Sequence, residues 1–132
     1  RRQRQMCIRD RGDIFMVPDE DLTLPPESLR GEPHLERRPF LILSNDNSNL
    51  DPNFLVVMGC PISSSTSFRT GFDVNLSKGQ GGVTKKCWIR VPAMQPLPKS
   101  LVATQDKTGT VPHSILEEVD TSIVQYLSMG EG

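Results

Sequence analysis

The stretch RRPFLILSND, Arg37 to Asp46, sets two arginines and a proline directly before an apolar run. A short apolar run that is bounded by turn residues is typical of a buried strand, so a strand is expected over residues 38–45. Arginine is normally exposed in folded proteins. By itself, a pair of guanidinium groups at the entrance to the core therefore favours a solvated strand end, and it leaves open why the chain places two charges there.

Length and cysteine usage limit the class of protein. A chain of 132 residues fits one domain with a single core. No apolar run approaches the ~20 residues that span a bilayer, so no membrane association is expected. The cysteines Cys7, Cys60 and Cys87 show neither C-x-x-C spacing nor a histidine at a zinc-ligand offset. They favour a reduced, cytoplasmic protein with buried thiols and predict no metal site or cofactor.

The first eleven residues, RRQRQMCIRDR, resemble the translation of a transposase-type sequencing adapter read in frame. The alternative is a genuine basic arm that binds nucleic acid. We favour the adapter origin, expect residues 1–11 to make few contacts, and assign the domain to residues 12–132. Without the five arginines and one aspartate of this segment, the net charge changes from −1 to −5.

Several further strands and loops are expected. The apolar runs and alternating patterns predict strands over residues 12–17, 54–60, 72–76, 86–92 and 109–111. Residues 18–37 are acidic and rich in proline and predict a long loop, a kind of segment that is commonly functional. The Asn, Asp and Ser residues of 44–53 predict a turn, and MQPLPKSLV (94–102) is expected to be irregular because of its prolines.

One amphipathic helix is expected from about Pro112 to Met129. Its apolar residues recur at helical spacing on one stripe, and Gly130 is a suitable end. Many short strands followed by one packed helix predict a mainly β fold, a small β-barrel with a C-terminal α-helix.

The order of these segments carries a resemblance. GDIF (12–15), RRPFLILSND, VVMGCPISS (56–64), FDVNL (72–76) and GTV followed by LEEVDTSIVQYL together resemble the MazF/PemK family from residue 12 to the end. RPFLILSND is similar to the family block R-P-x-L-V-L-S-N-D, and CPISS stands in the place of the P-[IV]-[ST] block. Members are toxins of bacterial toxin–antitoxin pairs, mostly sequence-specific endoribonucleases. The resemblance implies an SH3-like barrel, usually a homodimer, with single-stranded RNA and a cognate antitoxin as partners.

The resemblance also implies a chemistry. These enzymes cleave RNA without a metal, because the 2′-hydroxyl of the substrate attacks the adjacent phosphorus. The site must transfer protons and stabilise a phosphorane. Arg38 matches the family's catalytic arginine, whose fork binds two phosphate oxygens. Ser63 matches the catalytic Thr/Ser position, and His34 is a further candidate for proton transfer.

Ordinary roles compete with these assignments. Arg38 could be a solvated strand end. In the catalytic role as well, its charge is expected at an exposed strand mouth, so Arg38→Ala should abolish cleavage and cost only ~0.5 kcal/mol of stability. Ser63 could belong to an ordinary polar loop, and His34 could be inert. The candidates for RNA contact could equally be solubilising side chains; they are Arg37, Ser64, Arg69, Lys85, Lys86 and Arg90.

Other residues are assigned to the core or to no chemical role. Trp88 could stack on a base, but its flanks favour a core position. Cys60 and Cys87 are expected to be core thiols. His113 is expected to have no chemical role.

One departure bears on specificity and activity. Many members carry D/E-Q-[IV]-[RK] after the fourth core strand, where this chain has RVPAMQ (90–95). Two alternatives to a nuclease therefore stay open. One is a non-enzymatic toxin similar to CcdB, which binds gyrase, and the other is a catalytically lapsed relative that binds a partner. The acidic net charge also opposes RNA binding as a whole, although a local basic groove is screened from distant charges.

Overall fold

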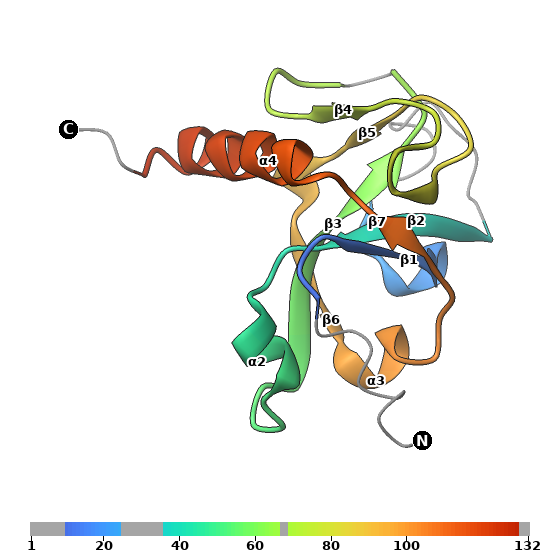
Figure 1. Cartoon of the computed structure of the whole chain (residues 1–132), viewed down its shortest axis with the longest axis vertical. Coiled ribbons are helices and arrows are strands. Elements are labelled where there is room, and N and C mark those ends of the chain that lie inside the picture. Colours follow the sequence, from blue (N-terminus) through green and yellow to red (C-terminus); the bar gives the residue numbers. More distant parts are fainter. Residues whose placement is uncertain (1–9, 25–35, 67–68, 130–132) are drawn as a thin grey trace.

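The computed structural model describes residues 10–24, 36–66 and 69–129. It confirms a mainly β fold, in which seven antiparallel strands curl into a half-barrel and a helix follows at the C-terminus (Figure 1). The strands are β1 (Asp13–Pro18), β2 (Arg37–Ile42), β3 (Val56–Ser63), β4 (Val74–Leu76), β5 (Cys87–Ile89), β6 (Gln95–Pro98) and β7 (Lys107–Thr110). The helices are α2 (Asp46–Leu50), α3 (Lys99–Val102) and α4 (His113–Tyr126), with 3₁₀ turns η2 (Asp19–Asp21), η3 (Gln80–Gly82) and η4 (Val91–Ala93).

The strands follow the order β4-β5-β3-β2-β1-β7, and β6 pairs with the first half of β3. In this register Phe15 lies opposite Phe40, and Phe40 lies opposite Pro61. Because successive side chains alternate across a strand, these three residues share one face and their sequence neighbours share the other. The expected RPFLILSND strand is thus the centre of the sheet.

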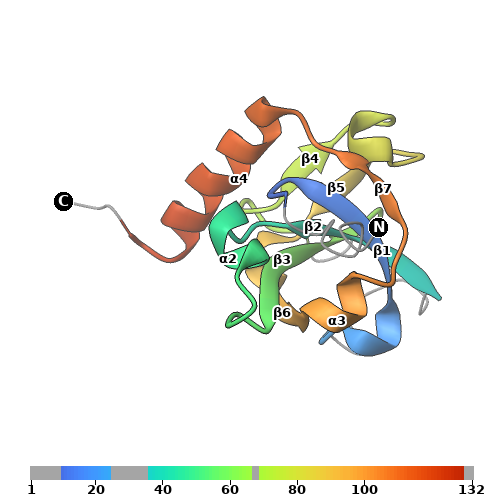
Figure 2. The same ribbon diagram turned by 60° about the horizontal axis from the view of Figure 1, so that its bottom comes forward.

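Each face of the sheet has its own core. On one face the apolar residues of α4 belong to the same cluster as Leu41, Cys60 and Ile62. Figures 1 and 2 show α4 beside the end of the sheet that holds β4 and β5. On the other face Phe15, Val17 and Phe40 belong to a second cluster, which includes residues of α3 and β6. Among the described residues, neither cluster extends along β2 to the end of that second face beyond Phe40, so polar residues can occupy this end.

Gly59 allows β2 and β3 to approach closely at the centre. A Cβ atom at this position would lie 2.0 Å from the carbonyl oxygen of Leu41 and 2.6 Å from the ring of Phe40. No side chain fits there, so the glycine is required by the close approach of the two strands.

The segment expected to be a turn after β2 contains a helix. Asn45 caps α2, because its side chain accepts a hydrogen bond from the Ser48 N–H at 2.8 Å. Asn and Asp favour turns and helix N-caps for the same reason, a short side chain that bonds to the local backbone. The composition therefore indicated the local bonding but not the helical turn that follows it.

The segment MQPLPKSLV, expected to be irregular, forms β6 and α3. Pro96 and Pro98 lie opposite Met58 and Val56 in the ladder with β3. Proline is tolerated in an edge strand, where its missing N–H need not join a ladder. The expectation of irregular structure was wrong because β6 is such an edge.

The predicted C-terminal helix is confirmed, with different ends. Pro112 is the residue before the first helical position rather than the first helical residue. The helix ends earlier than Gly130, in a turn where Ser128 has a positive φ of 57° and the N–H of Met129 donates to the Val124 carbonyl at 2.8 Å. This is the Schellman pattern, here with serine in the left-handed position that glycine usually takes.

Arg11 makes several contacts, although residues 1–11 were expected to make few. Its guanidinium donates to the Leu43 carbonyl at 2.9 Å and forms an ion pair with Asp120 of α4. Its backbone N–H donates to Asp46 at 2.6 Å. Arg11 thus joins β2, α2 and α4, while residues 1–9 lie outside the described ranges. Within those ranges no helix combines the length and apolarity needed to cross a bilayer.

Candidate active site

Arg38 is a buried partner in an ion pair. Only 1% of the residue is exposed. Its Nε donates to Oδ1 of Asp19 at 2.7 Å, and its Nη2 donates to Oδ2 at 3.1 Å. Its Nη1 donates to the Ile62 carbonyl at 3.3 Å. The alternative of a solvated strand end was therefore wrong, and so was the expectation that Arg38 is exposed at the strand mouth. A buried guanidinium needs such a counter-charge.

The strand register explains why Asp19 reaches Arg38. Pro18, the last residue of β1, lies opposite Arg37, and η2 begins with Asp19. The Asp19 N–H donates to the Glu36 carbonyl at 3.4 Å, which keeps the turn against β2. The sequence pattern gave no role to Asp19. The only signal was an acidic residue directly after a strand that pairs with the arginine's strand.

Ser63 ends β3 beside this pair. The residue is 6% exposed, and its Oγ accepts a hydrogen bond from the Ser65 N–H at 3.1 Å. Since Phe40 lies opposite Pro61, alternation places Arg38 and Ser63 on the same face of neighbouring strands. The fold therefore brings together the two residues that the family blocks indicated.

A second group of cations surrounds Trp88, the middle residue of β5. The Arg69 guanidinium lies 4.3 Å from the centre of the Trp88 ring, and the Lys86 ammonium lies 5.3 Å from it. Trp88 is half-buried and belongs to neither core cluster. The expectation that it is a core residue was therefore wrong.

Arg90 lies on the same face, after β5. It forms an ion pair with Asp73 at 2.8 Å, and it also donates to the Ser65 carbonyl. The second contact joins it to the turn that follows Ser63. Arg69, Lys86 and Arg90 thus gather around β4 and β5 on the face that carries Arg38.

The other predicted contacts lie apart from this group or outside the described ranges. Arg37 is exposed and donates to Gln105 at 2.7 Å, on the face opposite Arg38. Ser64 and Lys85 are exposed without a described side-chain role. His34 lies outside the described residues. His113 is exposed at the start of α4, and its Nε2 lies 3.3 Å from Oε2 of Glu117.

The departure RVPAMQ corresponds to η4 and the start of β6. Gln95 of this segment holds the residues after η2, because its side chain accepts from the Thr23 N–H at 2.8 Å and donates to the Thr23 carbonyl at 3.2 Å. This pair ties the Asp19 turn to the edge strand β6. No pattern in the sequence indicated this contact.

The two described thiols are buried, as expected. Burial raises the pKa of Cys60 to about 12, and the charge of Asp73 adds to the rise. Burial also raises the pKa of Cys87 to about 11, against a lowering by Lys85. A protonated thiol is a poor nucleophile and a poor ligand. Among the described residues no cluster of His, Cys, Asp or Glu could hold a metal ion.

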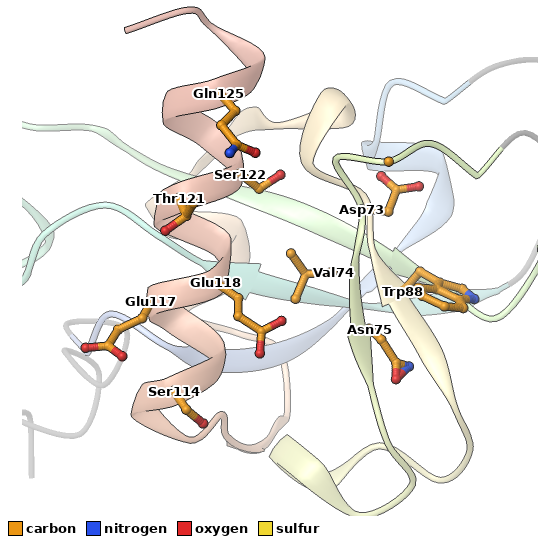
Figure 3. Close-up of a pocket in the computed structure, with 11 residues that line it drawn as sticks. Asp73, Val74, Asn75, Trp88, Ser114, Glu117, Glu118, Thr121, Ser122 and Gln125 are labelled. Carbon is orange, nitrogen blue, oxygen red and sulfur yellow. The ribbon is translucent and has the colours of Figure 1, made fainter. Parts of the chain in front are cut away.

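An open hollow of about 710 Å³ lies between α4 and the β4–β5 edge of the sheet. Figure 3 shows Glu117 and Glu118 on the helix side, with Asn75 and Trp88 on the strand side. Its size is within the range of small-molecule sites.

Comparison with protein families gives one match. Residues 10–127 match the family model described as PemK-like, MazF-like toxin of type II toxin–antitoxin system. No curated protein shows significant sequence similarity to the chain.

Solved structures with the same fold are distant in sequence. A MazE–MazF crystal structure from Deinococcus radiodurans is 21% identical, with 92% of this chain and 96% of that chain covered and a TM-score of 0.65. The Mycobacterium tuberculosis toxin MazF-mt6 is 16% identical, with 90% and 99% covered and a TM-score of 0.66. An endoribonuclease from a mycobacterial species is 16% identical, with 92% and 93% covered and a TM-score of 0.64. At these identities the matches establish a shared fold.

Proposed function

The chain belongs to the PemK-like, MazF-like toxins of type II toxin–antitoxin systems, and from this premise we propose that it is a metal-independent endoribonuclease that cleaves single-stranded RNA. The observation that carries the proposal is the placement of Arg38 and Ser63 on one face of neighbouring strands. Both belong to the sequence blocks that resemble the family most closely.

The proposed reaction uses the substrate's own nucleophile. The 2′-hydroxyl attacks the adjacent phosphorus, the 5′-oxygen leaves, and a 2′,3′-cyclic phosphate forms. Arg38 supplies positive charge to the phosphorane, and Asp19 positions the guanidinium through its two-point contact. The Ser63 hydroxyl holds a phosphate oxygen or relays a proton. Because Arg38 is 1% exposed, phosphate contact requires a rearrangement of this site.

Analysis of reaction products tests the proposal. We expect the purified chain to cleave single-stranded RNA to fragments that end in a 2′,3′-cyclic phosphate and a 5′-hydroxyl. EDTA should leave the rate unchanged. An oligonucleotide with a 2′-deoxyribose at the cleavage position should resist cleavage because it lacks the nucleophile. Cleavage of that substrate at the same bond would exclude the mechanism.

Partners follow from the same proposal. A cognate antitoxin would neutralise the toxin. In support, the D. radiodurans structure with the same fold is a structure of MazE–MazF. We also propose a homodimer, supported by large apolar side chains that are exposed on the described surface. The reaction would take place in the cytoplasm, on mRNA.

A catalytically lapsed, partner-binding relative is the second candidate. The observation in its favour is the neutralised and buried state of Arg38. Pro92 and Ala93 also occupy the region where many relatives carry an acidic residue and glutamine. The two candidates differ in one measurement, since the lapsed relative would bind the antitoxin without cleaving any RNA.

A further inference from the structure

We propose that Trp88 and Asn75 form a nucleobase subsite, which stacks and reads one base of the RNA that flanks the scissile phosphate. The subsite rests on the proposed nuclease function. Trp88 lies in none of the segments that carry the family resemblance, and Asn75 belongs to FDVNL, a segment to which the resemblance assigns no role.

The register of the sheet places this subsite beside the proposed catalytic residues. Trp88 lies directly opposite Ser63 on one side and opposite Asn75 on the other. Direct partners share a face, so Ser63, Trp88 and Asn75 form a row across β3, β5 and β4. Arg38 lies on the same face of β2, two residues before Phe40, whose partner is Pro61. Neighbouring strands are ~4.8 Å apart. The Trp88 ring is therefore within reach of a nucleotide whose phosphate lies at Ser63.

The surroundings of Trp88 are those of a stacking platform. Its sequence neighbours Cys87 and Ile89 take the core positions on the α4 face. The ring lies on the opposite face, where the planar Arg69 guanidinium covers it at 4.3 Å. A flat cation in this position occupies the space that a flat base would fill. Lys86, at 5.3 Å, adds charge for the backbone of the same strand.

Asn75 supplies a means of reading the stacked base. Its Nδ2 is buried, and among the described residues it has no hydrogen-bond partner; the same is true of Oδ1 of Asp73. Buried polar atoms normally have partners, and an unpartnered one costs free energy. A base edge presents both donors and acceptors and would satisfy such groups. Figure 3 shows Asn75 and Trp88 close together on neighbouring strands.

Tryptophan fluorescence gives a direct test, because Trp88 is the only tryptophan of the chain. The probe is a short single-stranded 2′-O-methyl RNA that contains the cleavage site and lacks the nucleophile. We expect the oligonucleotide to quench Trp88 fluorescence, since stacking places a base against the ring. A series with one abasic position each should identify a single nucleotide whose removal abolishes most of the quenching.

Variants separate stacking from general charge. By fluorescence anisotropy of a labelled oligonucleotide, Trp88→Leu should weaken binding about 5- to 150-fold, the cost of one stacked base. Trp88→Phe keeps an aromatic face and should retain most of the affinity. Asn75→Leu should reduce discrimination between bases at the stacked position. Lys78→Ala removes an exposed charge from the turn after β4 and should change affinity less than Trp88→Leu does.

The outcomes also distinguish the subsite from the nuclease proposal. If the wild-type chain cleaves RNA but the oligonucleotide binds without quenching, or Trp88→Leu binds like the wild type, the subsite is excluded and the nuclease stands. If quenching and the Trp88→Leu defect are observed without cleavage, Trp88 stacks on a base of bound RNA, but the nuclease and the placement beside a scissile phosphate are excluded. Equal loss in Trp88→Leu and Trp88→Phe would also exclude stacking.

Discussion

Arg38 is both a buried partner in an ion pair and the proposed catalytic residue. The resemblance of RPFLILSND to a family block suggested a functional guanidinium, and the apolar run after it placed Arg38 beside the core. It could not predict burial of the charge, because burial depends on Asp19, which is nineteen positions away. Only the pairing of β1 with β2 brings the two together. A long-range contact between two polar residues leaves no periodic pattern in the sequence.

The first prediction concerns the stability of this pair. Arg38→Ala should destabilise the fold by about 3–5 kcal/mol, because it leaves the Asp19 carboxylate buried without its partner. The same change should lower the cleavage rate by ~10²–10³ through loss of a preorganised donor. Urea unfolding and cleavage rates measured under folded conditions give the two effects separately.

A double variant serves as the control for that prediction. Arg38→Met with Asp19→Leu removes both charges and should recover much of the lost stability, because apolar replacements of a buried pair are often neutral or stabilising. Cleavage should stay absent. An Arg38→Ala variant that unfolds at the wild-type urea concentration would show that the pair is not buried in solution.

The second prediction concerns the hydroxyl of Ser63. Ser63→Ala should lower the single-turnover cleavage rate, but by less than Arg38→Ala does. The neutral hydroxyl only assists the stabilisation of the phosphorane, for which Arg38 supplies the positive charge. Ser63→Thr keeps a hydroxyl at the position and should stay close to the wild-type rate. Equal cleavage rates in the wild type, Ser63→Ala and Ser63→Thr would rule out a role for the hydroxyl in catalysis.

Among the elements, those with continuous apolar or alternating patterns were predictable. β2 and β3 are apolar runs, and α4 carries a stripe at helical spacing, so their hydrophobic patterns reflect burial. The short elements α2, α3 and β6 were not predictable. Each depends on a specific contact, such as the Lys99 ammonium bonded to the Ser48 and Asp51 carbonyls at 2.8 and 2.9 Å. Such contacts arise from the tertiary fold.

The packing of the α4 face gives a prediction about thiol reactivity. Burial raises the pKa values of Cys60 and Cys87, so both thiols should remain protonated near pH 8 and react slowly with Ellman's reagent. In a Cys7→Ser background, unfolding in urea should release two reactive thiols. Fast reaction of either thiol under native conditions would contradict the packing of β3 and β5 under α4.

The same shifts give a direction for pH dependence. Above about pH 9 the unfolded chain loses thiol protons that the folded state retains. The contribution of these groups to stability is therefore present below that pH and is lost as the pH rises toward the folded pKa values. Urea midpoints at pH 8 and pH 10 should show a smaller decrease in a Cys60→Ala variant than in the wild type.

Over the whole molecule, the net charge differs from the charge of the face that carries the proposed site. The chain is acidic overall, which opposes the binding of a polyanion. On the face with Arg38, Arg69 and Arg90, Asp19 and Asp73 form ion pairs with Arg38 and Arg90, so the positive charge of this face comes mainly from Arg69 and Lys86. At physiological salt, charges beyond ~8 Å are largely screened from it. The sequence revealed the net charge but not this local arrangement, because the residues come from separate strands and loops.

Two groups of exposed apolar side chains bear on assembly of the whole molecule. One follows α2 and includes Leu55, which is 76% exposed, and the other ends α4 and includes Leu127, which is 48% exposed. In a symmetric dimer the same surface meets itself, so a charge introduced there opposes its own copy. Large exposed apolar groups that contact a second copy would be removed from water.

We therefore expect a homodimer at micromolar concentration, without antitoxin, and expect one of two matched variants to disrupt it. Leu55→Asp should produce monomers if the α2–β3 surface forms the interface, and Leu127→Asp should do so if the end of α4 forms it. The unaffected variant is the control for the other, because both add one carboxylate to an exposed position. Sedimentation velocity distinguishes the species by mass, and a monomeric wild type at micromolar concentration would exclude the dimer. Dimers in both variants would instead place the interface on another surface of the barrel.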